Sequence, residues 1–313
     1  MIDYSRREFG AAALAGAALV KTGRAAHHKP NSLIHGVQVG AITYSFRSLP
    51  DQSAQATLKY VVDSGLSAIE LMGSPAEAYA GRPPLGPRRR RGEPPTPEQE
   101  AAEKALKAWR LSVSMDQYKA LRKMYNDAGV SIYAFKLLRT DMSDEECEYV
   151  FNVAEALGCT HTTLELPTDE AQLKRLGEFA ERKKIYVAYH THAQGTMDAF
   201  NRAFELSPGN MANVDLGHYV AGGNVGGSTI EFLKKHHARI SSFHLKDRQT
   251  PENGAGNLPW GSGDTPIKEI LQTVKKHGWK MPATVELEYR IPEDSDAVAE
   301  VKKCVAYCRE ALA

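Results

Sequence analysis

The chain alternates between short apolar runs and longer segments in which apolar residues recur every three or four positions. The short runs are rich in β-branched and aromatic residues, which is typical of buried strands. They lie at Val37–Ile42, Ala68–Leu71, Ser131–Lys136, Thr160–Glu165, Ile185–His190, Ala212–Asp215, Ile240–His244 and Ala283–Glu286. Helical periodicity is found at Ala54–Ser64, Met115–Asp127, Asp144–Leu157, Glu170–Lys183, Met197–Leu206, Thr229–His236, Pro266–His277 and Ala297–Leu312. This alternation predicts a parallel sheet covered by helices.

Eight strands, each followed by a helix, are what a closed parallel barrel requires, so we predict an α/β protein with a single (β/α)8 TIM barrel domain. Gly65, Gly129, Gly158 and Gly278 come after four of the helices, where a left-handed residue ends a helix. The main alternative is a doubly wound open sheet. That fold normally carries a glycine-rich phosphate loop after its first strand, and Thr43–Phe46 contains no glycine.

One segment interrupts the alternation between the second strand and the second helix. Residues 73–110 contain several prolines and the run Arg88–Arg91, which predicts a long insertion on the catalytic face of the barrel. We interpret the arginine run as a solvated loop, with capture of an anionic substrate or contact with a membrane surface as alternatives. The predicted barrel covers residues 35–313, and residues 27–34 form a linker before it.

The first 26 residues have the pattern of an export signal. Arg6 and Arg7 precede the weakly hydrophobic run Gly10–Val20, and Ala25–Ala26 offers small residues for cleavage. Paired arginines in this position are typical of twin-arginine signals. A membrane anchor and a frayed helix are the alternatives, but the apolar run is shorter than the roughly 20 residues of a spanning helix. We therefore expect a periplasmic protein with no stable membrane insertion after the signal is removed.

Composition narrows the function classes. The 313 residues include 39 basic and 38 acidic side chains, and this balance argues against a dedicated nucleic-acid binder. The four cysteines form no CxxC pair, which excludes a thiolate zinc site and a disulfide-built small domain. We expect Cys147, Cys159, Cys304 and Cys308 to be buried small hydrophobes rather than disulfide partners.

Ionisable residues stand at or just after the ends of seven predicted strands. In a TIM barrel these ends meet at one mouth, where the active site lies. The residues are Glu70, Lys136, Glu165, His190, His192, Asp215, His218, His244, Lys246, Asp247, Glu286 and Glu288. Several carboxylates that face one pocket repel each other unless a cation neutralises them. The alternative is that these groups cap helices and pair with arginines.

Four of these residues make an oxygen-rich set with one imidazole: Glu165, Asp215, His244 and Glu286. Such a set suits one divalent metal ion. We expect Mn²⁺, and Mg²⁺, Co²⁺, Fe²⁺ and Zn²⁺ stay open because the ligand types do not separate them.

Several motifs occur in a characteristic order: Ile69–Gly73 with Ala76–Gly81, Thr163–Glu165, Asp215–His218, Phe243–Asp247, Trp260–Asp264 and Val285–Glu286. In these motifs the chain resembles the xylose-isomerase-like barrel superfamily, in its sugar phosphate isomerase/epimerase and endonuclease-IV-like branch. The resemblance covers nearly all of residues 35–312. The Asp-x-x-His and His-x-Lys-Asp elements are its most specific parts.

The resemblance implies roles for the strand-end residues. The metal ligands of such enzymes fall on Glu165, Asp215, His244 and Glu286, and the two glutamates also move protons on opposite faces of the substrate. His190 is expected to join them as a catalytic residue. Substrate-binding roles are expected for His218, Lys246, His192, Glu70 and Lys136.

Two positions depart from the DNA-repair members, which bind three metals with additional histidines from the second and third strands. Glu70 and Lys136 stand there in this chain, so we expect no trinuclear nuclease site. On the eighth strand either Glu286 or Glu288 could be the ligand, and we prefer Glu286 with Glu288 as its support.

The resemblance implies a divalent-metal-dependent sugar isomerase or epimerase that works through an enediolate. Export favours a non-phosphorylated sugar or keto-sugar as substrate. The alternatives are a 3-keto-glycoside lyase that cleaves by β-elimination and a periplasmic sugar-binding protein without turnover. The expected partners are a carbohydrate and no nucleic acid. A homodimer and an oxidoreductase that makes keto-sugars are further expectations.

Overall fold

The computed structural model describes residues 29–87 and 92–313. The expected export signal over residues 1–26 and the run Arg88–Arg91 lie outside these residues.

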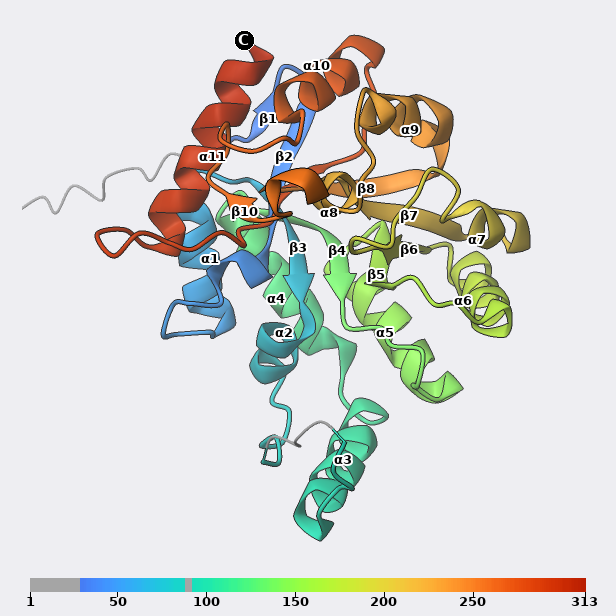
Figure 1. Cartoon of the computed structure of the whole chain (residues 1–313). Coiled ribbons are helices and arrows are strands. Elements are labelled where there is room, and N and C mark those ends of the chain that lie inside the picture. The colour runs from blue at the N-terminus through green and yellow to red at the C-terminus, as the bar shows by residue number, and fades with distance from the viewer. Residues whose placement is uncertain (1–28, 88–91) are drawn as a thin grey trace, which may run out of the picture.

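Eight parallel strands form a closed barrel (Figure 1). In hydrogen-bonded order they are β2 (Val37–Ile42), β11 (Ala283–Val285), β8 (Ile240–Leu245), β7 (Asn210–Asp215), β6 (Tyr186–His190), β5 (His161–Glu165), β4 (Ser131–Lys136) and β3 (Ala68–Met72). β3 also pairs with β2, which closes the ring. The predicted TIM barrel is confirmed, and the strand bounds agree with the expected runs to within two residues.

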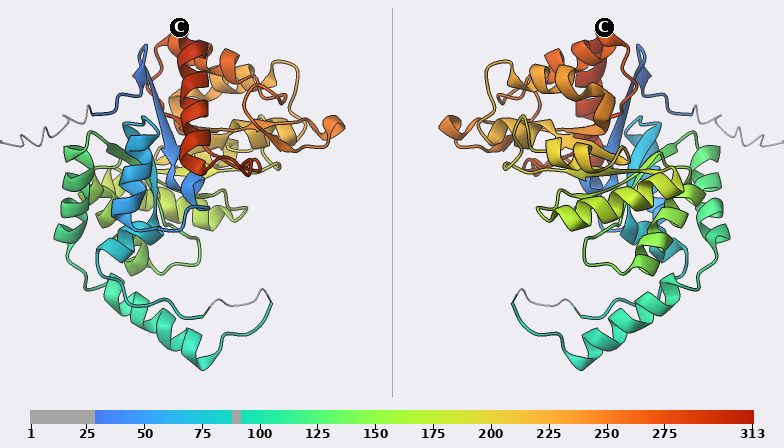
Figure 2. Two further views of the ribbon diagram at one scale, coloured as in Figure 1. Left: turned by 90° about the vertical axis from the view of Figure 1, so that its left-hand side faces the viewer. Right: turned by 90° about the vertical axis from the view of Figure 1, so that its right-hand side faces the viewer.

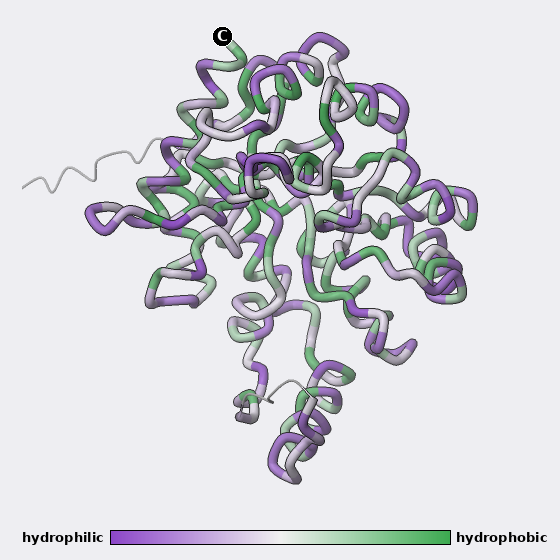
Figure 3. Tube along the Cα trace, viewed as in Figure 1, coloured by the Kyte–Doolittle hydropathy of each residue, from purple (hydrophilic) through white to green (hydrophobic). Residues whose placement is uncertain are grey.

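Helices surround the barrel at α1 (Ala54–Asp63), α4 (Met115–Asp127), α5 (Asp144–Leu157), α6 (Glu170–Lys183), α7 (Asn201–Leu206), α9 (Ser228–His236), α10 (Ile267–His277) and α11 (Ala297–Leu312). Along these helices hydrophilic and hydrophobic residues alternate, as an outer layer requires (Figure 3). α5 shows how its ends are fixed. Ser143 and Glu146 form a capping box at its start, and Gly158 ends it with a φ of 78°.

Some elements were not expected from the sequence. β1 (Leu33–Ile34) pairs antiparallel with β2, at the end of the range assigned to the linker. α8 (Leu216–Ala221) directly follows β7, and β9 (Asp247–Arg248) pairs with β10 (Asn257–Leu258) beyond β8. α7 begins at Asn201 rather than at Met197, because residues 197–200 form turns.

The segment between β3 and α4 contains two helices rather than a plain loop. α2 (Gly73–Tyr79) stays on the barrel, and α3 (Pro97–Arg110) extends from it as an arm (Figure 2). The C-terminal end of the arm is fixed by Arg110, whose Nε donates a 2.8 Å hydrogen bond to the buried Glu77 of α2. A second contact joins Arg110 to Glu146 of α5.

The core lies between the strands and the helix layer. All four cysteines are buried and free, as expected. Among the residues that the structure describes, no helix combines the length and the apolar character that crossing a bilayer requires.

Candidate active site and metal centre

A cluster of buried charged side chains occupies the C-terminal end of the barrel, at the ends of β3, β7, β8 and β11. Glu70, Asp215, His244, Lys246 and Glu286 are each at most 7% exposed. Buried ionisable groups are costly unless they are paired. Glu70 and His244 lie within β3 and β8, whereas Asp215 ends β7. The closed barrel thereby brings together residues that are more than 200 positions apart in the chain.

Asp215 ends β7 and caps α8. Its Oδ1 accepts a 2.7 Å hydrogen bond from the backbone N–H of His218. Its Oδ2 accepts no hydrogen bond from any described residue, although Nζ of Lys246 lies 2.9 Å away. Burial, opposed by the charge of Lys246, raises the pKa of Asp215 to about 6. One carboxylate oxygen is therefore fixed by a hydrogen bond, and the other is held only by the ion pair with Lys246.

His244 of β8 lies between two carboxylates. Its Nδ1 lies 2.8 Å from Oε2 of Glu286, and its Nε2 lies 2.7 Å from Oε2 of Glu70. Burial would lower the pKa of His244, but the two carboxylates outweigh burial and raise it to about 10. The pKa of Glu70 falls to about 2 because His244 outweighs the effect of burial. In the absence of a metal the imidazole is thus a cation held by both glutamates.

Lys246 supplies the second positive charge. Its Nζ lies 2.9 Å from Asp215 and from Glu286, and it donates a 2.6 Å hydrogen bond to Glu288. These carboxylates raise the pKa of Lys246 despite its burial. The carboxylates of the cluster are therefore partly neutralised by the chain itself. We expected Lys246 to contact substrate, and the structure instead places it almost entirely inside this ion network.

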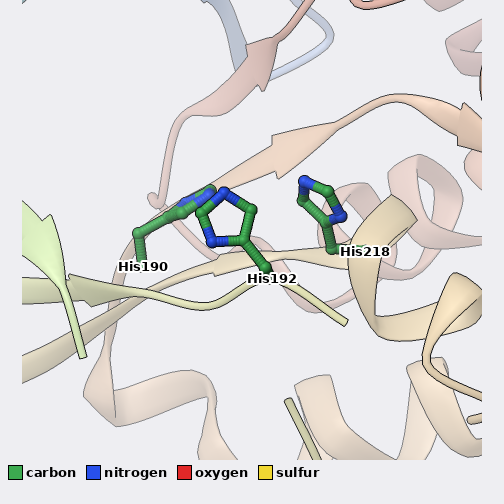
Figure 4. Close-up of side chains that lie close together, drawn as sticks. All are labelled: His190, His192 and His218. Atoms are coloured by element: carbon green, nitrogen blue, oxygen red, sulfur yellow. The ribbon is translucent and has the colours of Figure 1, made fainter. Parts of the chain in front are cut away.

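Three further imidazoles stand at the same end of the barrel: His190 from β6, His192 just after it and His218 from α8. Figure 4 shows their rings close together, and the ring centroids of His192 and His218 are 4.6 Å apart. Burial, together with nearby positive charges, lowers the pKa of His190 well below its ordinary value and that of His218 to about 2. Both rings are neutral at physiological pH.

Three of the four expected metal ligands come together in the structure. Asp215, His244 and Glu286 each offer one ligand atom within 4.8 Å of the others, and His190 completes this group. Glu165 does not belong to it. Its side chain is 53% exposed and lies 3.3 Å from Nζ of Lys136 and 3.1 Å from Nδ1 of His192. Glu165, Lys136 and His192 thus form the rim of the mouth.

Glu70 also differs from its expected role. We expected it to bind substrate, but it is fully buried beneath His244. Its two oxygens accept hydrogen bonds from Thr163 at 2.6 Å and from Asn213 at 3.3 Å. A side chain enclosed in this way has no surface for substrate and instead orients His244.

The residues present fit a divalent cation. Oδ2 of Asp215 and Nδ1 of His190 are buried and have no hydrogen-bond partner in the described part of the chain. Two carboxylates and two imidazoles are a donor set that Mn²⁺, Fe²⁺, Co²⁺ and Zn²⁺ accept. A second group, His190 with His192 and His218, also lies within ligand distance, so His190 borders both groups.

Two residues near the site have roles that the sequence reasoning missed. Arg248 donates a hydrogen bond to Nδ1 of His218. The carboxylate of Asp247 accepts hydrogen bonds from the backbone N–H groups of Gly261, Ser262, Gly263 and Thr265. The alternation of His244 and Lys246 continues to Arg248 and could have identified it. The Trp260–Asp264 motif supplies three of these backbone N–H groups, so its role is to bind the side chain of Asp247.

A family model described as xylose isomerase-like TIM barrel matches residues 58–308. No curated protein sequence matches the chain significantly.

Three solved structures illustrate the similarity of fold. A sugar phosphate isomerase/epimerase from Parabacteroides distasonis is 18% identical, with a TM-score of 0.58 over 88% of this chain and 95% of its own.

The second is a xylose isomerase-like TIM barrel protein from Mycobacterium smegmatis in complex with magnesium. It is 15% identical, with a TM-score of 0.57 over 89% of this chain and 97% of its own. The third is the IOLI protein with a bound zinc atom, which is 13% identical, with a TM-score of 0.58 over 88% and 98%. At these identities the structures show the shared fold.

Proposed function

Since the chain belongs to the xylose isomerase-like TIM barrel family, we propose that it is a divalent-metal-dependent isomerase or epimerase of a non-phosphorylated sugar or keto-sugar. The observation that supports this most is the buried group of Asp215, His244, Glu286 and His190 at the catalytic end of the barrel. A protein that only binds sugars has no need of buried carboxylates, which are costly to desolvate.

Asp215, His244 and Glu286 would hold the cation, with His190 as the fourth ligand. Once bound, a divalent cation supplies Lewis-acid stabilisation of negative charge on substrate oxygens. We retain Mn²⁺ as the preferred metal from the mixed carboxylate and imidazole donors, with Mg²⁺, Co²⁺, Fe²⁺ and Zn²⁺ as alternatives.

Glu165 is the proposed base. Its carboxylate is exposed at the mouth and can approach a carbon-bound proton next to a carbonyl group, which leaves an enediolate. Lys136 and His192 hold the two oxygens of Glu165 in place from either side. A positioned base of this kind contributes roughly 10²–10⁴-fold to the rate. Return of a solvent proton from the other side of the carbon gives the epimer.

The expected export signal supports a free sugar as substrate, because phosphorylated sugars belong to the cytoplasm. We propose a periplasmic location on that basis alone. Retention in the cytoplasm of a variant with Arg6→Lys and Arg7→Lys tests the signal, and unchanged export would contradict it.

The experiment that tests the function is proton exchange in D₂O. The Mn²⁺-loaded protein is incubated with D-fructose, D-tagatose and a 3-keto-glucoside, and deuterium uptake is followed by NMR. Uptake with an intact carbon skeleton is the expected result. Release of the aglycone from the 3-keto-glucoside would identify a lyase, and no reaction with any of the sugars would favour a binding protein.

A further inference from the structure

Polar side chains occupy the interior of the barrel next to the metal residues. The interior of a TIM barrel is usually filled by branched apolar residues. In this barrel His161 of β5, Asn213 of β7 and Ser242 of β8 are completely buried there, and we call these three side chains the interior row. Buried polar groups lower the free energy of unfolding unless each of them has a hydrogen-bond partner. The interior row therefore needs an explanation other than packing.

The interior row forms a continuous series of hydrogen bonds that ends at Glu70. Nε2 of His161 lies 2.8 Å from Oγ of Ser242. The same Oγ lies 2.8 Å from Oδ1 of Asn213. Nδ2 of Asn213 lies 3.3 Å from Oε2 of Glu70, which is also the oxygen that contacts Nε2 of His244 at 2.7 Å. Glu70 therefore links the interior row to the metal residues.

The carboxylate of Glu70 fixes the direction of each hydrogen bond in this series. An ionised carboxylate only accepts hydrogen bonds, so the amide of Asn213 must present its NH₂ group to Glu70. The amide oxygen then faces Ser242, which must donate its single hydroxyl proton to that oxygen. Oγ of Ser242 is left to accept from His161. The proton of His161 therefore lies on Nε2.

The surroundings of the His161 ring agree with this direction. Burial lowers the pKa of His161 to about 4, so the ring is neutral at physiological pH and carries one proton. With that proton on Nε2, Nδ1 has a lone pair, and the hydroxyl of Thr160 lies 2.8 Å away as its donor. An amide of Asn213 turned the other way would reverse the series and place the proton on Nδ1. The tautomer of His161 thus reports how Asn213 faces Glu70.

We propose that His161 is a positioning residue of the metal centre, which acts through Ser242 and Asn213 to hold the carboxylate of Glu70 against His244. The inference rests on the proposed function in that Glu70 and His244 serve a bound divalent cation. Groups that orient a ligand histidine contribute roughly 10–100-fold to metal affinity. His161 acts through two further side chains, so we expect its effect at the lower end of that range.

The tautomer of His161 can be measured directly. Long-range ¹H–¹⁵N correlation spectra of the full chain with labelled histidine report the state of each ring nitrogen, and His161→Gln identifies the signals of His161. We expect the proton on Nε2 and a lone pair on Nδ1 in the wild-type protein. A proton on Nδ1 would overturn the proposal, because the amide of Asn213 would then present its oxygen to Glu70.

Ser242→Ala interrupts the series at its middle. We expect the affinity for Mn²⁺, measured by calorimetric titration, to fall about tenfold in this variant. Tyr133→Phe is the matched control, because it removes another buried hydrogen bond of the barrel interior, to Thr284 at 2.8 Å, and keeps the ring that stacks on His161. An unchanged affinity in Ser242→Ala, or an equal loss in Tyr133→Phe, would overturn the positioning role.

Two variants of His161 separate its donor from its volume. The amide of His161→Gln can replace the Nε2 donor, whereas His161→Leu fills space without a donor. We expect His161→Leu to lose affinity for Mn²⁺ as Ser242→Ala does, and His161→Gln to stay close to the wild type. Equal affinities in the two variants would overturn the proposal. Circular dichroism checks each fold, and Ser242→Ala decides the question if His161→Leu does not fold.

The same variants distinguish this inference from the proposed function. Tight Mn²⁺ binding that Ser242→Ala leaves unchanged overturns the inference alone. If the wild-type protein binds no Mn²⁺, the proposed function fails, and the Nε2 resonance of His244 then tests the series in the metal-free protein. We expect this resonance to shift in Ser242→Ala and to stay unchanged in Tyr133→Phe. An unchanged resonance in Ser242→Ala would show that the interior row does not position His244.

Discussion

The carboxylate of Glu70 lies 2.7 Å from Nε2 of His244, and both side chains are completely buried. A carboxylate behind a histidine fixes the ring and makes it a better metal ligand. Glu70 itself accepts hydrogen bonds from Thr163 and Asn213. These buried contacts therefore fix the orientation of His244.

Glu70→Gln should weaken metal binding while the fold persists. The amide has the same size as the carboxylate but no charge, and loss of such a supporting group costs roughly 10–100-fold in metal affinity. Calorimetric titration with Mn²⁺ measures the change, and circular dichroism checks the fold. Glu98→Gln on the exposed face of α3 is the matched control. An unchanged affinity in Glu70→Gln would show that Glu70 does not support His244.

The same pair makes the stability of the metal-free protein depend on pH. The pKa of Glu70 is about 2 rather than 4.5. Its contribution to the free energy of unfolding is therefore complete above pH 4.5 and is lost as the pH falls toward 2. The pKa of His244 is about 10 rather than 6.5. Its contribution to the free energy of unfolding is therefore complete below pH 6.5 and is lost as the pH rises toward 10. The pair therefore stabilises the fold most between these two limits.

Urea unfolding of the metal-free protein should give a larger free energy of unfolding at about pH 5.5 than at about pH 9. The difference should shrink in Glu70→Gln, which removes one of the two carboxylates that hold the histidine cation. An identical pH dependence in the variant and the wild type would mean that other groups cause it.

Gly263 lies too close to Asp247 for any side chain. A Cβ atom at this position would stand 2.4 Å from Oδ1 of Asp247, while the Gly263 N–H donates to Oδ2 of the same carboxylate. Gly263→Ala should therefore lower the free energy of unfolding by about 1–3 kcal/mol. Gly256→Ala is the control, since its Cβ would meet only the flexible end of Gln249 at 3.1 Å. Equal urea midpoints for the two variants would contradict the steric explanation.

Glu165 and His190 should have separable effects. Glu165→Gln removes the proposed base and should lower proton exchange at least about 100-fold while the metal stays bound. His190→Ala removes a buried ligand and should weaken metal binding. Metal content by mass spectrometry after dialysis separates the two roles. If Glu165→Gln loses the metal and His190→Ala keeps it, Glu165 is a metal ligand, as expected from the sequence.

Much of this site could be read from the sequence because strand ends fix it. Asp215 ends β7, His244 is the last residue but one of β8, and Glu286 directly follows β11, so the closed barrel brings them together whatever their rotamers. The position of each strand follows from its apolar run, and the chain order of strands and helices determines the topology.

The assignment of Glu165 and His190 depends on side-chain direction, which the sequence pattern does not give. The two residues pair directly across β5 and β6, so both stand at the mouth. His190 turns into the buried cluster, and Glu165 turns toward Lys136 and His192. Similarly, nothing in the strand pattern reveals that the long side chain of Lys246 reaches three carboxylates.

The arm formed by α3 did carry a local signal. Thr96, Pro97 and Gln99 make a helix start with a capping box, but the surrounding prolines suggested a loop. Whether a helix of this kind packs on the barrel or extends from it depends on tertiary contacts such as the ion pair of Arg110 with Glu77.

The most direct measurement is the metal stoichiometry of Asp215→Asn beside the wild-type protein. Oδ2 of Asp215 has no hydrogen-bond partner among the described residues, while Oδ1 can still cap α8 when the side chain is an amide. After equilibrium dialysis against Mn²⁺, we expect one tightly bound ion per wild-type chain and an affinity lower by roughly 100-fold or more in Asp215→Asn. No tight site in the wild type, or equal binding by both proteins, would contradict a metal centre at Asp215, His244 and Glu286.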